Sequence, residues 1–372
     1  MSKAIVRRDL LKMGMAAAAF LAAEKAFPRN AYAAVSAISL EKCLSMTPEQ
    51  MAASSGRVDA AWKYILAGAD EIRNPELKAK VKGILANPSP TLAKNMDVQS
   101  VIAMLKKEGL LKEEAKTVLP EYKSADKAIQ PFFSAPGSGY ASHHSYPGGL
   151  VTHTALNLRI SKSFFDSYRE VFEFDLDRDV VLAAQILHDL HKPWVFQWQK
   201  DASSRTEQPL AGTGEHHVLS IAESIVRGIP AAVVVAQACA HDHPGSSKSE
   251  ASVVGWLKAA AILAGADPVK RGLLAEDGKT LPMPRRMEGF VTHLGDHDYV
   301  LSVPVVGWLL PAMKKIAAAD YGMSEKDISG QPFHCLRNYI FSQETAMNLY
   351  SAYVREGDAG VRRVMNTLVS VR

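Results

Sequence analysis

Apolar residues recur at three- and four-residue spacing in one segment after another of this 372-residue chain, while the alternating pattern of strands is nearly absent. This spacing places apolar side chains along one face of a helix. The clearest runs are DVVLAAQILHDLH (179–191), EHHVLSIAESIVRGI (215–229), AAVVVAQACAHDH (231–243) and VVGWLKAAAILAG (253–265). The sequence therefore predicts an all-α protein in which many helices pack as a bundle.

A polar-faced helical region precedes these runs, and a loop separates the two parts. Between residues 38 and 125 the apolar residues keep helical spacing but bring no reactive side chains together. Within this region, residues 98–119 predict two short helices around Gly109. The stretch SAPGSGYASHHSYPGG (134–149) is rich in glycine, serine and proline, and predicts a loop. We expect residues 34–130 to form an additional N-terminal helical region.

The first 33 residues have the features of a targeting segment. VRRDLLK places Arg7 and Arg8 before two leucines, and an alanine-rich, mildly apolar stretch follows. The segment ends in the small-residue pattern Ala31-Tyr32-Ala33. It resembles a twin-arginine export signal with cleavage after Ala33. This resemblance implies export by the twin-arginine translocation machinery and a periplasmic or otherwise exported location.

The charge of the chain gives no reason to expect a nucleic-acid partner. Residues 1–33 contain six basic and two acidic residues, which equals the formal net charge of +4 of the whole chain. The remainder is therefore close to neutral, without the basic surface that nucleic-acid binding requires. No uninterrupted apolar run reaches about 18 residues, so we expect no membrane span. The three cysteines have neither CxxC spacing nor the number of a disulfide framework.

The histidines are unevenly distributed. All twelve lie between His143 and His334, and several stand at the ends of apolar helical runs. The intervals between them are too long for a zinc finger, but side chains from several helices can meet in the core of a bundle. The residues that stand out, in chain order, are His153 in GGLVTHT, His188 and Asp189 in LHDLH, His217 in GEHHVLSIAE, His241 in CAHDHPG, and Asp296 in THLGDHD.

This ordered set resembles the HD-domain metal-dependent phosphohydrolases over roughly residues 140 to 300. HHSYPGGLVTHT is similar to the loop and first ligand helix of HD-type exonucleases, and HDLHKP is similar to the HD-x-x-K element of the family. The resemblance implies an HD metal-binding domain over residues 131–310. The C-terminal helices, residues 311–372, would pack on it.

The residue types suit a pair of divalent metal ions. Adjacent helical residues point about 100° apart, so His188 and Asp189 would not compete for one ligand position. A carboxylate has two oxygens and can bridge two ions. Imidazole and carboxylate ligands together favour Mn, Fe, Zn, Co or Ni over magnesium. The resemblance implies two ions per chain held by His153, His188, Asp189, His217, His241 and Asp296. Such ions lower the pKa of bound water.

Several of these ligand assignments have a neighbouring residue as a second choice. His217 has the spacing of the family's third histidine to Ala222 and Glu223, but Ile221 stands where the family usually has glycine. The second choices are His216 for His217, His243 for His241, and Asp298 or Asp267 for Asp296.

Further residues near these motifs have two interpretations each. Lys192 matches the lysine of HD-x-x-K, which implies that it holds a phosphate or polarises a metal-bound oxygen. With Asp189 it is our candidate for a catalytic role; the alternative for Lys192 is a solvated lysine at a helix end. The aromatic residues Trp194, Phe196 and Trp198 are core residues or the wall of a substrate pocket. We expect His143 and His144 to order a loop that can close over the site, and His334 to be structural.

Three functions remain compatible with the sequence. The leading hypothesis is an exported metal-dependent phosphohydrolase that cleaves a small-molecule phosphomonoester or phosphodiester with metal-activated water. The second hypothesis is an HD-fold di-iron oxygenase of a small polar substrate. The third is a non-catalytic metal-binding or sensor module whose N-terminal helices contact a partner.

Overall fold

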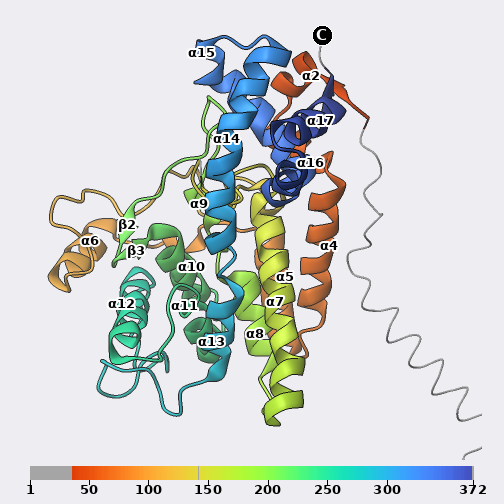
Figure 1. Cartoon of the computed structure of the whole chain (residues 1–372). Coiled ribbons are helices and arrows are strands. Elements are labelled where there is room, and N and C mark those ends of the chain that lie inside the picture. The colour runs from red at the N-terminus through yellow and green to blue at the C-terminus, as the bar shows by residue number, and fades with distance from the viewer. Residues whose placement is uncertain (1–35, 141, 371–372) are drawn as a thin grey trace, which may run out of the picture. The chain divides into compact units, whose positions relative to one another are not determined.

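The computed structural model of the chain describes residues 36–140 and 142–370, and the predicted export signal lies outside them (Figure 1). Helices dominate the described residues, so the predicted all-α class is confirmed. The helices are α2 (Leu40–Ser45), α3 (Pro48–Ala53), α4 (Gly56–Asp70), α5 (Pro75–Ala86), α6 (Val98–Lys107), α7 (Gly149–Phe172), α8 (Arg178–Leu187), α9 (Lys192–Val195), α10 (Glu215–Val226), α11 (Ala231–Ala238), α12 (Ser247–Leu263), α13 (Met287–Gly295), α14 (Tyr299–Tyr321), α15 (Glu325–Ile328), α16 (Gln331–Glu356) and α17 (Asp358–Leu368).

Two very short ladders connect distant or neighbouring segments of the described chain. Strand β1 (Ile38–Ser39) pairs in parallel with β4 (Val369–Ser370), which ties the beginning of the described chain to its end. Strand β2 (Pro209–Leu210) pairs antiparallel with β3 (Thr213–Gly214), directly before α10. The second ladder is a tight hairpin, and it bears on the site described below.

Helix α8 lies at the centre of the packing. It contacts α4, α5, α7, α11 and α13, and every residue from Val180 to Leu187 is buried. Asp177 caps its first turn by accepting a hydrogen bond from the Val180 amide at 3.3 Å. Because α8 from Val180 to Leu187 is apolar except for Gln185, neighbouring helices must cover it on nearly every side. The residues that directly follow α8, His188 and Asp189, are therefore delivered into the interior.

The turn that precedes α7 depends on two glycines. Gly148 has φ +81°, and a Cβ built on it would lie 2.5 Å from the Val58 side chain of α4. A Cβ on Gly149 would lie 1.7 Å from the backbone oxygen of His144. Larger residues would push the loop away from α4 and α7. The GG pair thus holds the histidine-bearing loop against the first turn of α7.

One local expectation requires correction. The second short helix expected after Gly109 is absent, because α6 ends at Lys107 and no helix follows until η2 (Phe132–Ser134). Four of the ten residues 110–119 are charged, and Val118 is the one buried apolar side chain in this described stretch, so little tertiary burial would stabilise a helix there. Residues 287–321 form two helices, α13 and α14, which residues 296–298 separate.

Residues Ser36–Arg372 form one compact unit. The proposed boundary at residue 130 lies just before η2, and the proposed boundary at residue 310 lies inside α14. Length and composition identify one candidate membrane-crossing stretch in the described residues, Met287–Tyr321, with a mean hydropathy of 1.4. Since 44% of its most apolar window is buried by the rest of the unit, and core helices of soluble proteins pass the same test, this is weak evidence for a span.

Candidate metal centre

Four buried side chains from three parts of the helical core meet at one point. His153 comes from α7, His188 and Asp189 follow α8, and Asp296 follows α13. One ligand atom of each lies within 4.8 Å of those of the others. His153 Nε2 is 3.2 Å from Asp189 Oδ2 and 3.0 Å from Asp296 Oδ1. His188 Nε2 is 3.0 and 3.2 Å from the same two oxygens. Two imidazoles and two carboxylates therefore converge, a donor set that suits a transition metal.

The hydrogen bonds around this cluster leave donor atoms free for a metal. His188 Nδ1 donates to the Gln185 carbonyl oxygen at 2.8 Å, so Nε2 is the ring nitrogen that faces the cluster and could bind a metal. Neither oxygen of Asp189 accepts a hydrogen bond of good geometry, although Lys192 Nζ lies 2.6 Å from Oδ2. Buried oxygens normally have partners. The four residues therefore fit a bound cation.

Opposite charges in the cluster stabilise the ionised forms of its carboxylates and of His188. Burial alone raises the pKa of Asp189, but the charges of His188 and Lys192 outweigh it and hold that pKa well below its usual range. Burial likewise raises the pKa of Asp296, and His188 and His153 lower it well below normal. The two carboxylates overcome the effect of burial on His188 and raise its pKa to about 10. Both carboxylates are thus anionic at neutral pH.

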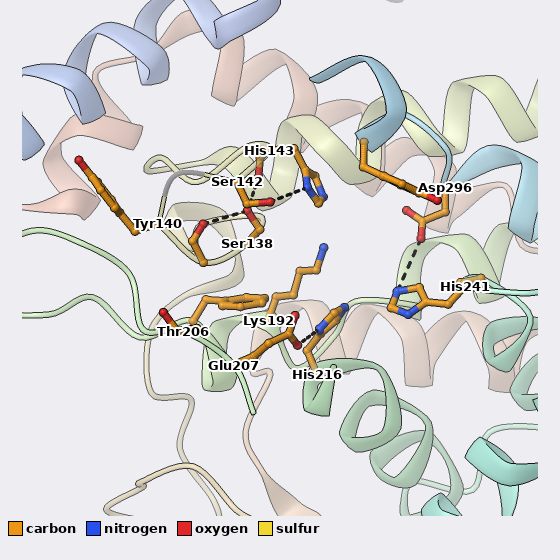
Figure 2. Close-up of a pocket in the computed structure, with 14 residues that line it drawn as sticks. Ser138, Tyr140, Ser142, His143, Lys192, Thr206, Glu207, His216, His241 and Asp296 are labelled. Carbon is orange, nitrogen blue, oxygen red and sulfur yellow. Dashed lines mark hydrogen bonds and ion pairs between the residues drawn. The ribbon is translucent and has the colours of Figure 1, made fainter. Parts of the chain in front are cut away.

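Two further histidines face the opposite oxygens of the same carboxylates. His216 Nε2 lies 3.5 Å from Asp189 Oδ1, and His241 Nε2 lies 4.0 Å from Asp296 Oδ2. Figure 2 shows both rings directed into the same cavity. Each carboxylate therefore has one oxygen toward His153 and His188 and the other toward a second histidine. This is the arrangement expected of carboxylates that bridge two ions.

His216 and His241 are each oriented through their other ring nitrogen. His216 Nδ1 lies 2.5 Å from Glu207 Oε2, and His241 Nδ1 lies 2.9 Å from Thr213 Oγ1. Such partners fix the tautomer and the ring orientation of histidine ligands. The sequence reasoning missed both Glu207 and Thr213. The signal that could have found them is the AG turn at 211–212, which closes the hairpin before α10.

The structure places the sequence candidate His217 behind the cavity. It is fully buried, and its Nε2 lies 3.1 Å from the Ala238 carbonyl oxygen. Its ring stacks on that of His241 at 4.0 Å between centroids and contacts Trp256 edge-on. Burial lowers the pKa of His217 to about 3. Of the two adjacent histidines, His216 lines the cavity.

The structure gives other partners to the three second-choice ligands His243, Asp267 and Asp298. Those of His243 and Asp267 lie away from the cluster, and that of Asp298 lies beside it. His243 packs against Phe290 and His293. Asp267 is half-exposed and accepts hydrogen bonds from the two amides that follow Pro268. Asp298 Oδ2 lies 2.5 Å from His144 Nε2 and also accepts from Ser302. One atom each of His144, His153 and Asp298 lie within 4.8 Å of one another, so the His144–Asp298 pair flanks the cluster.

A cavity of about 500 Å³ opens beside the cluster. Figure 2 shows the Lys192 ammonium group in its middle, with His143 on one side and His216 on the other. Lys192 is 3% exposed and begins α9, so its charge is directed inward rather than solvated. His143 lines the cavity from the 134–149 loop, as expected of a loop that covers the site.

The remaining residues singled out in the sequence have mostly structural positions. Phe196 lines the cavity and contacts the His216 ring, whereas Trp194 is fully buried and donates to the Glu121 carbonyl oxygen. Trp198 lies outside the lining and donates to a backbone oxygen of the 134–149 loop. His334 Nδ1 contacts the Asp201 carbonyl oxygen at 2.8 Å, which agrees with a structural role.

Comparison with known proteins identifies a relative that is a phosphodiesterase. No protein-family model and no solved structure matches the chain. Over 176 residues it is 28% identical to a dihydroneopterin 2',3'-cyclic phosphate phosphodiesterase of Methanocaldococcus jannaschii. The match covers 47% of this chain and 57% of the relative, so a little over half of that enzyme's length is represented. A metal-dependent phosphohydrolase is the class that this similarity and the buried His/Asp cluster support together.

Proposed function

We propose that this protein is an HD-type metal-dependent phosphohydrolase that cleaves a phosphodiester. One observation carries the proposal. Asp189 and Asp296 each have one oxygen toward His153 and His188 and the other oxygen toward a second histidine, His216 or His241. Lys192 lies beside them. Resident divalent ions would supply an activated water and neutralise charge that develops on the phosphate. The similarity to a cyclic-phosphate phosphodiesterase favours a diester over a monoester as the first substrate to test.

The residues of the chain would divide the work as follows. His153, His188, Asp189 and Asp296 would hold one ion, and His216 and His241, which face the other oxygens of the two carboxylates, would hold a second. Lys192 binds a phosphate oxygen, because it is the cation whose ammonium group reaches the middle of the cavity (Figure 2). A buried ammonium group acts more strongly on an anion than a solvated one does.

The wall of the cavity supplies polar groups for the rest of the substrate. Ser138, Ser142 and His143 line it from the 134–149 loop, and Glu207 lines it from the hairpin side. Burial is the main cause that lowers the pKa of His143 well below its usual range, so this ring is neutral at pH 7. A neutral imidazole can orient an ester oxygen or a hydroxyl group without adding charge.

We also propose that the protein acts outside the cytoplasm. Arg7 and Arg8, followed by the apolar stretch and Ala31-Tyr32-Ala33, support export by the twin-arginine route. That route carries folded proteins, which would allow the buried metal centre to be loaded before export.

The test is metal counting followed by turnover. Protein loaded separately with Mn, Fe, Zn, Co or Ni is assayed with bis(p-nitrophenyl) phosphate and with 2',3'-cyclic nucleoside monophosphates. We expect about two ions per chain and hydrolysis that Asp189→Asn abolishes. Two irons with dioxygen uptake and no hydrolysis would replace the proposal with the oxygenase. Bound metal without either reaction would favour the non-catalytic module.

A further inference from the structure

Two loops line a large part of the cavity. They are residues 134–148, which contribute Tyr140 and His143, and residues 196–208, which contribute Thr206 and Glu207. We call them the wall loops. Figure 2 shows Tyr140 at the opposite end of the cavity from Asp296 and His241. The wall loops contain neither His153 nor His188, so their position bears on what the cavity admits more directly than on how the first ion is held, although Glu207 of the second loop also orients His216.

The N-terminal half of α16 contacts both wall loops. His334 Nδ1 contacts the Asp201 carbonyl oxygen, and its ring lies 4.5 Å from that of Tyr140 between centroids. Asn338 Nδ2 donates to the Ala202 carbonyl oxygen at 2.7 Å. These two side chains, with Arg337 between them, lie on one face of α16 at helical spacing. The helix therefore connects two loops that are about 60 residues apart in sequence.

Arg337 makes the strongest of these contacts. Its Nη1 donates to the Ser145 carbonyl oxygen at 2.7 Å, and its Nη2 donates to Ser145 Oγ at 2.6 Å. The guanidinium carbon also lies 4.8 Å from the centroid of the Tyr140 ring and 5.1 Å from that of Phe341. One planar group thus holds Ser145 by two donors and Tyr140 by its face. Its Nη1 also donates to Asn338 Oδ1 at 3.0 Å, and Asn338 in turn holds the second wall loop at Ala202.

The burial of the Arg337 charge lowers the stability of the fold, which is unexpected for a residue with a purely structural role. It is fully buried, its Nε has no hydrogen-bond partner, and no ion pair with a carboxylate forms within the described residues. Burial lowers its pKa to about 10, so it remains a cation at neutral pH. An unpaired buried charge costs several kcal/mol, and an apolar side chain of similar volume would avoid that cost.

We propose that Arg337 is a positioning residue that fixes the wall loops and thereby determines which organic group of a phosphodiester the cavity admits. The selectivity part rests on the proposed function, whereas the loop-fixing part does not. The guanidinium sets the place of Tyr140 and Ser145 by two directed hydrogen bonds and one ring contact. A methionine at position 337 would fill a similar volume but would donate no hydrogen bond to Ser145 and so would not fix the loop.

The experiment compares Arg337→Met and Arg337→Lys with a control that contacts the same helix from α4. Arg57 of α4 holds the later part of α16 through the Gln343 carbonyl oxygen and Glu344. Arg57→Met therefore removes a contact to α16 at a residue that does not line the cavity. Metal content, hydrogen exchange of all segments, and kcat and KM are measured for each metal-loaded full-length variant. The substrates are bis(p-nitrophenyl) phosphate and methyl p-nitrophenyl phosphate, which share a leaving group and differ in the retained ester.

We expect Arg337→Met to raise amide exchange in both wall loops while α7 and α8 stay protected and at least one ion per chain stays bound, since His153 and His188 lie outside these loops. The ratio of kcat/KM for the two diesters should shift roughly tenfold, mainly through KM, because a displaced wall misplaces the substrate. Arg337→Lys should restore part of the ratio, and Arg57→Met should leave it unchanged. If Arg337→Met does not fold, Ser145→Ala replaces it. This variant removes the hydroxyl that accepts from Arg337 Nη2, so we expect the same changes in exchange and in the kcat/KM ratio, but smaller.

Unchanged exchange in the wall loops, or a ratio shifted equally by Arg57→Met, would overturn the proposal. If the unmodified protein hydrolyses neither diester, the proposed function fails. The exchange measurement then still decides whether Arg337 fixes the loops.

Discussion

Glu223 is the buried carboxylate whose removal has the most calculable effect. It lies on α10, is fully buried, and accepts hydrogen bonds from the Thr91 amide at 3.2 Å and the Leu92 amide at 2.9 Å. The Thr91 hydroxyl and Arg227 Nε also donate to it, the latter at 2.6 Å. His191 Nε2 completes the set at 3.2 Å, and the next residue along the chain is the Lys192 of the cavity. Glu223→Gln is therefore expected to loosen both the N-terminal region and the turn that carries this lysine.

The magnitude follows from the pKa of Glu223. Burial raises this pKa, but the hydrogen bond and charge of His191, with smaller contributions from Thr91 and Arg227, lower it from 4.5 to about 2. The ionised group is thus favoured by folding. Its stabilising effect is complete above pH 4.5 and is lost as the pH falls through 4.5 toward 2. A shift of this size corresponds to about 3 kcal/mol of unfolding free energy at pH 7.

The assay is denaturant unfolding of metal-loaded Glu223→Gln and unmodified protein between pH 3 and pH 7. We expect the glutamine variant to be less stable by about 3 kcal/mol at pH 7, and the difference to shrink by about 1.4 kcal/mol per pH unit below pH 4.5. Asp59→Asn is the control, because Asp59 forms an exposed pair with Lys63 that should contribute under about 1 kcal/mol. A difference that stays constant from pH 3 to pH 7 would refute the reasoning, since it would show that ionisation of Glu223 is not what stabilises the fold.

Three further predictions test the site and its location. His216→Gln should lower the metal content by about one ion per chain while the neighbouring His217→Gln leaves it unchanged, as measured by elemental analysis; the reverse result would restore the ligand that the sequence suggested. Lys192→Met should lower kcat/KM for a phosphodiester roughly 10- to 100-fold without metal loss, because a hydrogen bond from a charged donor contributes about 1.5–3 kcal/mol; an unchanged kcat/KM would exclude phosphate binding by this lysine. Replacing Arg7 and Arg8 by lysine should retain the protein in the cytoplasm, as followed by fractionation of a tagged full-length chain, and continued export would argue against the twin-arginine route.

Much of the fold could be predicted because helical periodicity is a local signal. The run from Val180 to Leu187 is apolar except for Gln185, which requires a central buried helix, and α8 has that place. The absent helix after Gly109 shows the limit of the same signal. Residues there keep helical spacing, but most of them are only partly buried or exposed, and tertiary burial rather than propensity stabilises most helices.

The choice between His216 and His217 could not be made from the sequence. The two residues are adjacent in the first turn of α10, and both are buried, so hydrophobic periodicity gives them the same status. Which ring faces Asp189 depends on the rotation of α10 about its axis. That rotation is set by packing against α11 and α12, which lie outside the spacing pattern of the motif. A spacing pattern transferred from a family identifies the turn of the helix that carries the ligand. The packing of the helix decides which side chain of that turn faces the site.

The hairpin before α10 contains residues of the site that the family motif does not include, and a turn signal together with the hydrogen-bonding needs of histidine can locate them. A histidine that binds a metal through Nε2 needs an acceptor for its Nδ1 proton, so a ligand histidine implies a partner that the motif does not contain. The turn at Ala211 and Gly212 pairs Pro209 with Gly214, which folds the chain back and brings Glu207 to His216. The same turn brings Thr213 to His241, from a different helix. One two-residue turn therefore orients both histidines of the proposed second metal position, and this explains why the sequence around it contributes to the site although it contains none of the proposed metal ligands.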